Sequence, residues 1–243
     1  MIKINVSTIG DMYVHDHEIG SEVGMANYEL FVVDFLMKNV KEDSNFMDIG
    51  GYEGYFILLM GQKIKKGTIY TFEPCNSSYE IIKKNIEIYS LNNVKLFHSA
   101  VTDKTSPEVL LTWRPGAQCV SRIFEFPPGV DNNTQSYERV PTVCLDDFEE
   151  TKIDLMKIDI EGGEVELFQG SKKFFSRNRD CKIVLELHCG NIKHRGINVD
   201  KFVESVDSMF NFYNFYNIKV DKKELIDCLN TNFGTAHYIF VPK

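Results

Sequence analysis

From residue 46 onward, short apolar runs alternate along the chain with segments of helical periodicity. Strands that are apolar along their whole length are buried on both faces, which is typical of parallel sheets covered by helices. The alternation therefore predicts an α/β fold, with a doubly wound, mostly parallel sheet in a three-layer αβα arrangement. The apolar runs cover 46–50, 68–72, 94–98, 153–158 and 182–188, and the helical segments cover 53–63, 77–89, 164–175 and 200–210.

Both ends of the chain are expected to add to this sheet without forming a second domain. Residues 2–6 alternate like a short strand, and 31–36 place apolar side chains on one face of a helix. Near the C-terminus, 215–220 and 236–241 are β-like and are expected to pair as an antiparallel edge.

An insertion interrupts the alternation at about 103–141. Its β-like runs 109–113 and 120–126 flank an Arg-Pro-Gly turn, which favours a hairpin. We expect a single domain over 1–243, made of an N-terminal extension or lid at 1–40 and a core at 45–243 that contains this hairpin.

Charge and cysteine content limit the classes of partner. The chain has 27 basic and 35 acidic side chains, a formal net charge of −8, so a nucleic-acid partner is not expected. No apolar stretch is long enough to span a membrane, and no signal peptide is visible. The six cysteines form no CxxC pair, which favours reduced thiols in a cytoplasmic protein.

The segment Asp48-Ile-Gly-Gly-Tyr-Glu-Gly54 carries the strongest chemical signal. It ends the first predicted strand of the core and opens a helix, and glycines there allow a tight turn and close approach of a ligand. In open α/β sheets, ligands bind beyond the carboxyl ends of the strands. The next strand ends at Glu73, about 20 residues on, where a carboxylate can accept hydrogen bonds from both hydroxyls of a ribose.

The loop favours one ribose-containing cofactor over another. Its glycines, Gly50, Gly51 and Gly54, do not match the dinucleotide pattern G-x-G-x-x-G. Asp48 would repel a pyrophosphate but suits the cationic amino-acid end of S-adenosylmethionine. An NAD-type cofactor is the alternative that Glu73 alone would allow, and a loop that merely shapes a turn is another.

Further candidate residues follow the fourth and fifth predicted strands. Asp159 and Glu161 lie two residues apart, so their side chains point the same way if the strand geometry persists. They could bind an ammonium group, orient an acceptor or accept a proton, or Glu161 could simply favour the next helix, as we expect of Glu164. His188 has the pKa range of a general base near neutral pH, or is a satisfied polar residue at a strand end.

Metal ligands are not expected in this chain. His15, Asp16 and His17 could form a site, but three ligands in a predicted loop fix no geometry, and we interpret them as a solvated turn.

Taken together, these segments resemble the FkbM-type branch of class I S-adenosylmethionine-dependent methyltransferases. The resemblance covers residues 45–190 and is carried by MDIGGYEGYF, IYTFEP, IIKKNIEIYSLNNVKLFHSAV, VPTVCLDDF, IDLMKIDIEGGEVELFQGSKKFF and IVLELH. It implies a Rossmann-like sheet of strand order 3-2-1-4-5-7-6 and an enzyme that methylates a small-molecule acceptor, chiefly a hydroxyl of a sugar or glycosylated metabolite. An NAD-type oxidoreductase and a non-catalytic cofactor-binding or scaffold protein of the same fold are the alternatives.

The resemblance also implies a role for each matching residue. Asp48, Gly50, Gly51 and Gly54 would cradle the methionine part of the cofactor, Glu73 would hold the ribose, and Ser99 and Ala100 would contact adenine. Asp159 and Glu161 would lie beside the transferring methyl, and His188 matches the histidine that closes the fifth strand in many members. The chain departs from the family's usual D-V-G-A-N-x-G at Gly51, Tyr52 and Glu53, which puts the details of methionine binding in doubt.

Acceptor recognition is expected from the parts of the chain outside the repeated units. Trp113, Arg114 and Tyr137 in the insertion could contact a sugar or pack the hairpin, and Tyr28 and Glu29 could cover the cofactor pocket.

Overall fold

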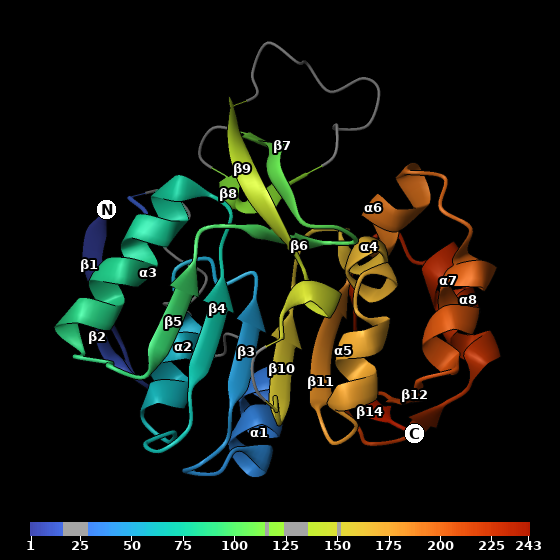
Figure 1. Cartoon of the computed structure of the whole chain (residues 1–243), viewed down its shortest axis with the longest axis horizontal. Helices are drawn as coiled ribbons and strands as arrows, with labels where there is room; N and C mark the ends of the chain where they lie inside the picture. Colours follow the sequence, from blue (N-terminus) through green and yellow to red (C-terminus); the bar gives the residue numbers. More distant parts are fainter. Residues whose placement is uncertain (17–28, 115–116, 124–135, 150–151) are drawn as a thin grey trace.

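The computed structural model describes residues 1–16, 29–114, 117–123, 136–149 and 152–243. Over these residues, the main sheet has the strand order β13-β12-β14-β11-β10-β3-β4-β5 (Figure 1). Its strands are β3 (Phe46–Ile49), β4 (Ile69–Phe72), β5 (Val94–Phe97), β10 (Leu155–Ile158), β11 (Lys182–Leu187), β12 (Phe210–Tyr213), β13 (Lys219–Val220) and β14 (Ala236–Pro242).

The pairing within the main sheet confirms the expected topology. β5, β4, β3, β10 and β11 are parallel neighbours, and β14 lies antiparallel between β11 and β12. In order along the chain, these seven strands reproduce the arrangement 3-2-1-4-5-7-6, and β13 extends the edge beside β12.

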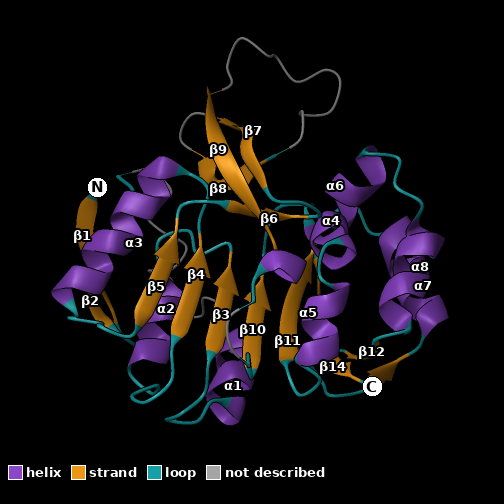
Figure 2. Cartoon of the chain, viewed as in Figure 1, coloured by secondary structure: helices purple, strands orange, loops and turns teal. Residues whose placement is uncertain are grey.

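Helices cover both faces of this sheet, giving three layers (Figure 2). The helices are α1 (Leu30–Asn39), α2 (Tyr55–Gly61), α3 (Asn76–Ile88), α4 (Glu164–Gln169), α5 (Lys172–Arg177), α6 (Cys189–His194), α7 (Val199–Asp207) and α8 (Lys222–Thr231), with a short 3-10 turn at Leu145–Asp147.

The two faces bury separate apolar cores. On one face, Val165, Phe168 and Phe174 of α4 and α5 pack on the sheet together with side chains of α7 and α8. On the other face, Leu36 of α1 and nearly all of α2 pack against Phe46. Burial of both faces explains why these strands are apolar along their whole length.

A smaller sheet lies beyond the arrowheads of the parallel strands (Figure 1). It contains β6 (Ala100–Thr102), β7 (Ser106–Arg114), β8 (Ala117–Arg122) and β9 (Ser136–Cys144), in the order β6-β9-β7-β8. β7 and β8 pair antiparallel, as the hairpin prediction expected. The sequence analysis did not anticipate that β9 would pair with β6 and β7, which turns the hairpin into part of a sheet.

The N-terminus forms a second small element, the N-terminal hairpin. Its strands β1 (Ile2–Val6) and β2 (Gly10–Val14) pair antiparallel, and β2 contacts α3 (Figure 1). Met12 and Val14 are fully buried in the core that α1 and α2 share. Part of the expected lid, 17–28, lies outside the described residues.

Three element predictions were wrong in detail. The strand expected at 215–220 is β12 at Phe210–Tyr213, followed by the two-residue β13. The helix expected at 164–175 is divided into α4 and α5 at Gly170. A Cβ added at this position would lie 2.7 Å from the Thr102 carbonyl oxygen. Helices α6 and α8 were not anticipated.

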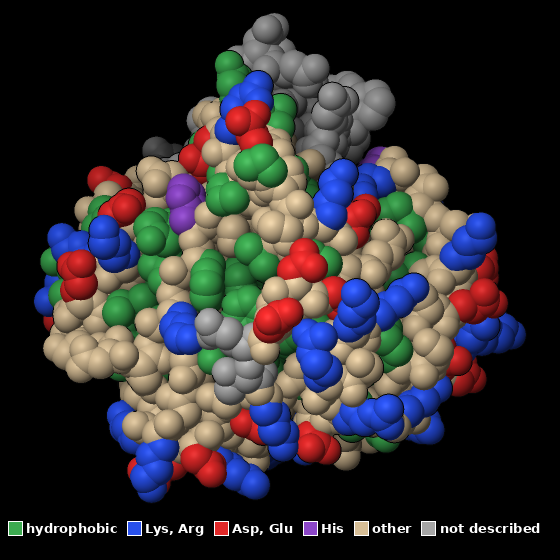
Figure 3. Space-filling model, viewed as in Figure 1, with side chains coloured by type: hydrophobic (Ala, Val, Ile, Leu, Met, Phe, Trp, Pro, Cys, Tyr) green, Lys and Arg blue, Asp and Glu red, His purple; other side chains and the backbone are tan. Residues whose placement is uncertain are grey.

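The helices and the surface charge bear on the possible partners. In the part of the chain that the structure describes, no helix has the length and apolar character of a membrane span. Basic and acidic side chains are interspersed over the face shown in Figure 3, with hydrophobic side chains near its middle.

Candidate functional site

A cavity lies at the carboxyl ends of the parallel strands, under the small sheet. It encloses about 640 Å³ of empty space, a volume that includes space open to solvent. Its polar lining residues are Tyr52, Glu73, Ser99, Asp159 and Glu161, its glycines are Gly50 and Gly163, and its apolar ones are Ile49, Phe72, Pro74, Ala100, Val101, Leu111, Ile123 and Ile160.

The turn after β3 requires glycine at Gly50. This residue has φ +91°, and a Cβ there would lie 1.8 Å from the carbonyl oxygen of Asp159. Its N–H donates to the Phe72 carbonyl, 3.0 Å away. The ends of β3, β4 and β10 therefore meet around Gly50, which lines the cavity.

Gly51 and Gly54 support this turn from behind the cavity wall. A Cβ on Gly51 would lie 2.6 Å from Thr71 Oγ1, and one on Gly54 would contact Ile82. Neither glycine is among the residues that line the cavity, and their expected contact with a cofactor stays a prediction.

Glu73 lies in the cavity wall and is oriented by backbone groups. Its Oε2 accepts from the Tyr52 N–H and its Oε1 from the Cys75 N–H, each at 2.8 Å. Burial raises the pKa of Glu73 to about 8, although these two donors oppose the shift. The carboxyl group is thus fixed in place, yet poorly solvated.

Ser99 and Ala100 also line the cavity, at the end of β5 and the start of β6. Ser99 is 4% exposed, and its Oγ has no hydrogen-bond partner among the described residues. A buried hydroxyl of this kind costs free energy unless something pairs with it.

Asp48 is placed differently from the expectation. It is the third residue of β3, 1% exposed, and it is not among the residues that line the cavity. Burial raises its pKa to about 7, opposed by the charge of Lys157 on β10. The structure therefore gives Asp48 no direct approach to the cavity, because its side chain lies on the face of the sheet covered by α1 and α2.

Tyr52 and Glu53, the departures from the family pattern, connect the glycine turn to the N-terminal hairpin. Glu53 is 1% exposed and its Oε1 accepts from the His15 N–H at 2.7 Å. The His15 ring stacks on Tyr52 with centroids 5.6 Å apart, and its Nε2 lies 3.0 Å from Ser78 Oγ.

The expected solvated turn at His15–His17 is therefore wrong for His15, which is 7% exposed and bonded on two sides. The tertiary contacts of β2 with α3 enclose it, and no local pattern signals them. His17 lies outside the described residues.

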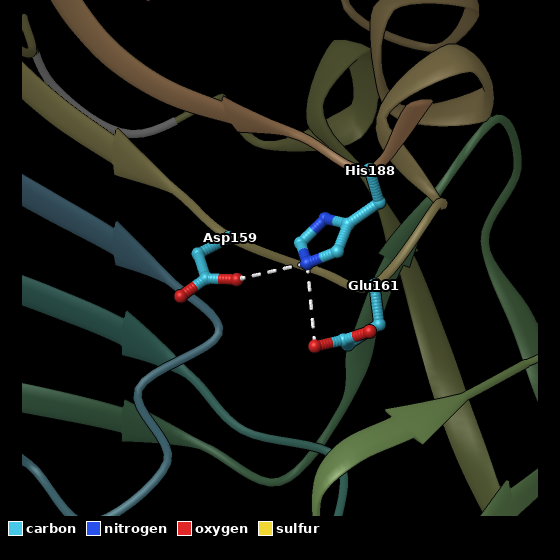
Figure 4. Close-up of side chains that lie close together, drawn as sticks. All are labelled: Asp159, Glu161 and His188. Atoms are coloured by element: carbon cyan, nitrogen blue, oxygen red, sulfur yellow. Dashed lines mark ion pairs between the residues drawn. The ribbon is translucent and has the colours of Figure 1, made fainter. Parts of the chain in front are cut away.

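His188 stands at the centre of a cluster of carboxylates beyond β10 and β11 (Figure 4). Its Nε2 lies 3.2 Å from Glu161 Oε1 and 3.8 Å from Asp159 Oδ1, while its Nδ1 lies 2.8 Å from Glu164 Oε1. The structure thus brings together Asp159, Glu161 and His188, as expected, and adds Glu164, which the sequence analysis had assigned to the helix terminus.

The protonation of His188 is at odds with a general base. Burial lowers its pKa, but the Glu164 and Glu161 carboxylates outweigh burial and raise it to about 11. An imidazole that already carries both protons at neutral pH cannot accept another. Asp159 and Glu161 line the cavity, whereas His188 is not among its lining residues.

Lys157 compensates part of this negative charge. It is 4% exposed and its Nζ donates to Asp159 Oδ2 at 2.9 Å. Burial alone would lower the pKa of Lys157, but the charges of Asp159, Glu29 and Asp48 raise it by more than burial lowers it. Lys157 therefore stays protonated. Sequence analysis missed this residue, although its position in an apolar strand two residues before Asp159 is a usable signal.

The residues expected to recognise an acceptor are only partly brought to the site. Trp113 packs beside Leu111 in the small sheet, and Tyr137 is 73% exposed. Glu29 lies at the start of α1, where one of its oxygens is within 4.8 Å of carboxylate oxygens of Asp159 and Glu186. Tyr28 and the Arg114 side chain are outside the described part of the structure.

Comparisons with known proteins agree with the geometry. Residues 48–217 match the model of the Methyltransferase FkbM domain family. A protein of Beauveria bassiana (strain ARSEF 2860) named Methyltransferase 1 is 26% identical over 147 residues, which are 53% of this chain and 59% of that protein. The match thus spans less than two thirds of that relative.

Solved structures share the fold at low sequence identity. Methyltransferase FkbM from Methylobacillus flagellatus KT superposes with a TM-score of 0.50 and 11% identity, over 83% of this chain and 44% of that one. A Streptococcus mutans structure described as a methyltransferase in complex with SAH gives 0.51 and 12%, over 88% and 97%. A Clostridium thermocellum structure described as an rRNA methylase gives 0.51 and 10%, over 87% and 93%. At these identities they show the class I methyltransferase fold alone.

Proposed function

Since the chain belongs to the family of FkbM methyltransferase domains, we propose that it transfers the methyl group of S-adenosylmethionine to a hydroxyl of a sugar or glycosylated small molecule. The observation that carries this proposal is the cavity at the carboxyl ends of β3, β4 and β10, where Gly50, Glu73 and Asp159 converge. The sugar class of the acceptor follows from the family resemblance alone.

The cavity residues fit the cofactor. Glu73 presents two oxygens, each of which accepts from one backbone N–H and keeps a further lone pair for a ribose hydroxyl. Ser99 offers a buried hydroxyl that lacks a partner in the described residues, and Ala100 beside it leaves room for a flat ring. S-adenosylmethionine supplies an electrophilic methyl group on a sulfonium, and its positive charges suit the acidic side chains of this edge.

The acceptor would bind at the β10 end of the cavity. Asp159 and Glu161 line it, so their carboxylates can orient a hydroxyl and take its proton as its oxygen bonds to the methyl carbon. The electron pair of the broken carbon–sulfur bond stays on sulfur, which leaves S-adenosylhomocysteine. His188, already protonated, would position Glu161 and Glu164 and would not act as the base.

The structure also bears on the alternative functions. Glu53 is directed to the N-terminal hairpin and does not line the cavity, so this departure from the family pattern does not block a cofactor. Tyr52, the other departure, lines the cavity, so a non-catalytic protein stays an alternative that a binding experiment must test. A nucleic-acid acceptor remains unexpected given the net charge of −8, and a cytoplasmic location remains part of the proposal.

Calorimetric titration of the full chain with S-adenosylmethionine, S-adenosylhomocysteine and NAD tests the proposal. We expect micromolar binding of both sulfur compounds and none of NAD. Binding of NAD alone would favour the oxidoreductase alternative, and no binding of any of the three would favour a scaffold. Transfer of a labelled methyl group to members of a glycoside panel, with an RNA panel beside it, then identifies the acceptor class.

A further inference from the structure

The cluster around His188 has the donor atoms and spacing of a metal site. His188 Nε2, Glu161 Oε1 and Asp159 Oδ1 all lie within 4.8 Å of one another, and Figure 4 shows both carboxylates directed at the same ring nitrogen. Ligands about 2.0–2.2 Å from one octahedral ion are separated by about 3–4 Å. The 3.2 Å and 3.8 Å separations from Nε2 match this requirement without large movement.

Neighbouring groups hold both carboxylates so that one oxygen of each faces the common point. Lys157 donates to Asp159 Oδ2 at 2.9 Å, which directs Oδ1 towards His188. Asn191 donates to the Glu161 backbone carbonyl at 3.1 Å and lies 3.4 Å from Glu161 Oε2, which leaves Oε1 towards the ring. The ligating atoms are thus oriented before any ion arrives, which lowers the cost of binding one.

The imidazole is oriented from its other side. Glu164 is fully buried, and its Oε1 accepts from His188 Nδ1 at 2.8 Å and from the Gly162 N–H at 3.1 Å. A carboxylate behind a histidine in this way fixes the tautomer that presents Nε2 as a ligand. The second oxygen of Glu164, Oε2, is buried and has no hydrogen-bond partner among the described residues.

An ion bound at His188 Nε2 would take the place of any proton on that nitrogen, because a histidine ligates a metal through a deprotonated ring nitrogen.

We propose that Asp159 Oδ1, Glu161 Oε1 and His188 Nε2 bind one divalent cation of the Mg²⁺ or Mn²⁺ type at the acceptor end of the cavity. Mg²⁺ and Mn²⁺ are hard ions that prefer carboxylate oxygens to thiolate ligands, and two of the three ligand atoms here are carboxylate oxygens. Asp159 and Glu161 line the cavity and His188 does not, so the remaining coordination positions face the cavity. Neighbouring hydroxyl oxygens of an acceptor fit such positions. Only this last role rests on the proposed function.

Binding of Mn²⁺ to the chelator-treated full chain, followed by electron paramagnetic resonance, tests the site without any activity assay. We expect one bound ion per chain and a nitrogen-14 modulation in the spin-echo spectrum from the His188 ring. Mg²⁺ should displace the ion. Glu161→Gln should weaken binding about 10-fold or more, and His188→Gln should also abolish the nitrogen signal.

Matched controls separate loss of ligands from general effects. Glu204→Gln on α7 and His194→Gln at the end of α6 remove the same chemical groups from exposed positions and should leave Mn²⁺ binding unchanged. Thermal melting shows whether each variant folds. Should Glu161→Gln or His188→Gln fail to fold, the nitrogen signal of the wild-type chain still decides, because no other histidine lies in this cluster among the described residues.

Each outcome either supports the site or overturns it. Absence of saturable Mn²⁺ binding below about 1 mM, or binding without the nitrogen signal, overturns it. Titration of the same samples with S-adenosylhomocysteine keeps this result apart from the proposed function. Cofactor binding without Mn²⁺ binding rejects the metal site alone, whereas Mn²⁺ binding with the nitrogen signal but no cofactor binding rejects the methyltransferase proposal alone.

Discussion

At the β4 end of the cavity, Glu73 accepts hydrogen bonds from two backbone N–H groups, whereas at the β10 and β11 ends the carboxylates surround the cations of Lys157 and His188. The first arrangement fixes a carboxyl group without supplying charge, so it suits neutral donors such as ribose hydroxyls. The second brings charged side chains of both signs together, and it is where the divalent cation is proposed to bind. The same edge of the sheet thus offers one region suited to neutral hydroxyl groups and one region built from charged side chains.

Gly50 joins these two regions, and its replacement is expected to have the largest effect. In Gly50→Ala the new Cβ would meet the Asp159 carbonyl 1.8 Å away, at a φ that alanine rarely adopts. We expect S-adenosylhomocysteine to bind about 1,000-fold more weakly, about 4 kcal/mol, by calorimetry. The control is Gly196→Ala, which has φ +64° but open space around its Cα and should bind normally. Normal binding by Gly50→Ala would show that the two regions are not coupled through this turn.

The second prediction concerns Asp48, whose pKa depends on the charge of Lys157, and its readout is the free energy of unfolding. Burial raises its pKa to about 7 in the folded protein from 3.8, so folding favours the protonated form. The contribution of Asp48 is therefore present below about pH 4 and is lost as the pH rises through about 7. Relative to wild type, Asp48→Asn should gain up to about 4 kcal/mol in unfolding free energy between pH 4 and 7, measured with urea.

Asp34→Asn is the matched control for this experiment, because Asp34 is exposed and pairs with Lys38. Its difference from wild type should stay flat over the same pH window. If the difference in unfolding free energy is also flat for Asp48→Asn, then Lys157 keeps the pKa of Asp48 near its ordinary value, and Asp48 is ionised over the whole window.

The third prediction concerns Glu73, at the β4 end of the cavity. With a pKa raised to about 8, Glu73 is mainly protonated below that pH, and ribose hydroxyls donate best to the carboxylate. The affinity for S-adenosylhomocysteine should rise up to about tenfold per pH unit between pH 6 and 8 and then level off. Glu73→Gln should bind more weakly with no such rise, while Glu80→Gln on α3 should behave like wild type. A pH-independent wild-type affinity would contradict the assigned role.

His15 is expected to give the smallest effect, since it supports the glycine turn from the N-terminal hairpin. His15→Ala removes the stacking on Tyr52 and the contact with Ser78, but keeps the backbone bond to Glu53. We expect a loss of about 1–2 kcal/mol in unfolding free energy, measured with urea. His194→Ala, at an exposed position, should lose less than half of that. A loss no greater than that of His194→Ala would mean that the hairpin is not anchored through this side chain.

The sequence by itself determined a mostly parallel sheet covered by helices and the edge at which the candidate residues lie, and the family resemblance implied the strand order. Apolar strands buried on both faces and glycines at Gly50 and Gly54 are local requirements, and each leaves a visible pattern of residue types. Glu73 and Asp159 could be located in the same way, because the carboxyl ends of parallel strands meet at one edge.

Only the tertiary structure decided which of these residues reach the cavity and in what charge state. Asp48 is buried on the face of the sheet that α1 and α2 cover, and His15 is enclosed where β2 contacts α3. The Glu164 and Glu161 carboxylates raise the pKa of His188. These properties arise from contacts between segments far apart in the chain. Burial and neighbouring charge, which set the protonation of an ionisable group, are properties of the packed structure and leave no local pattern in the sequence.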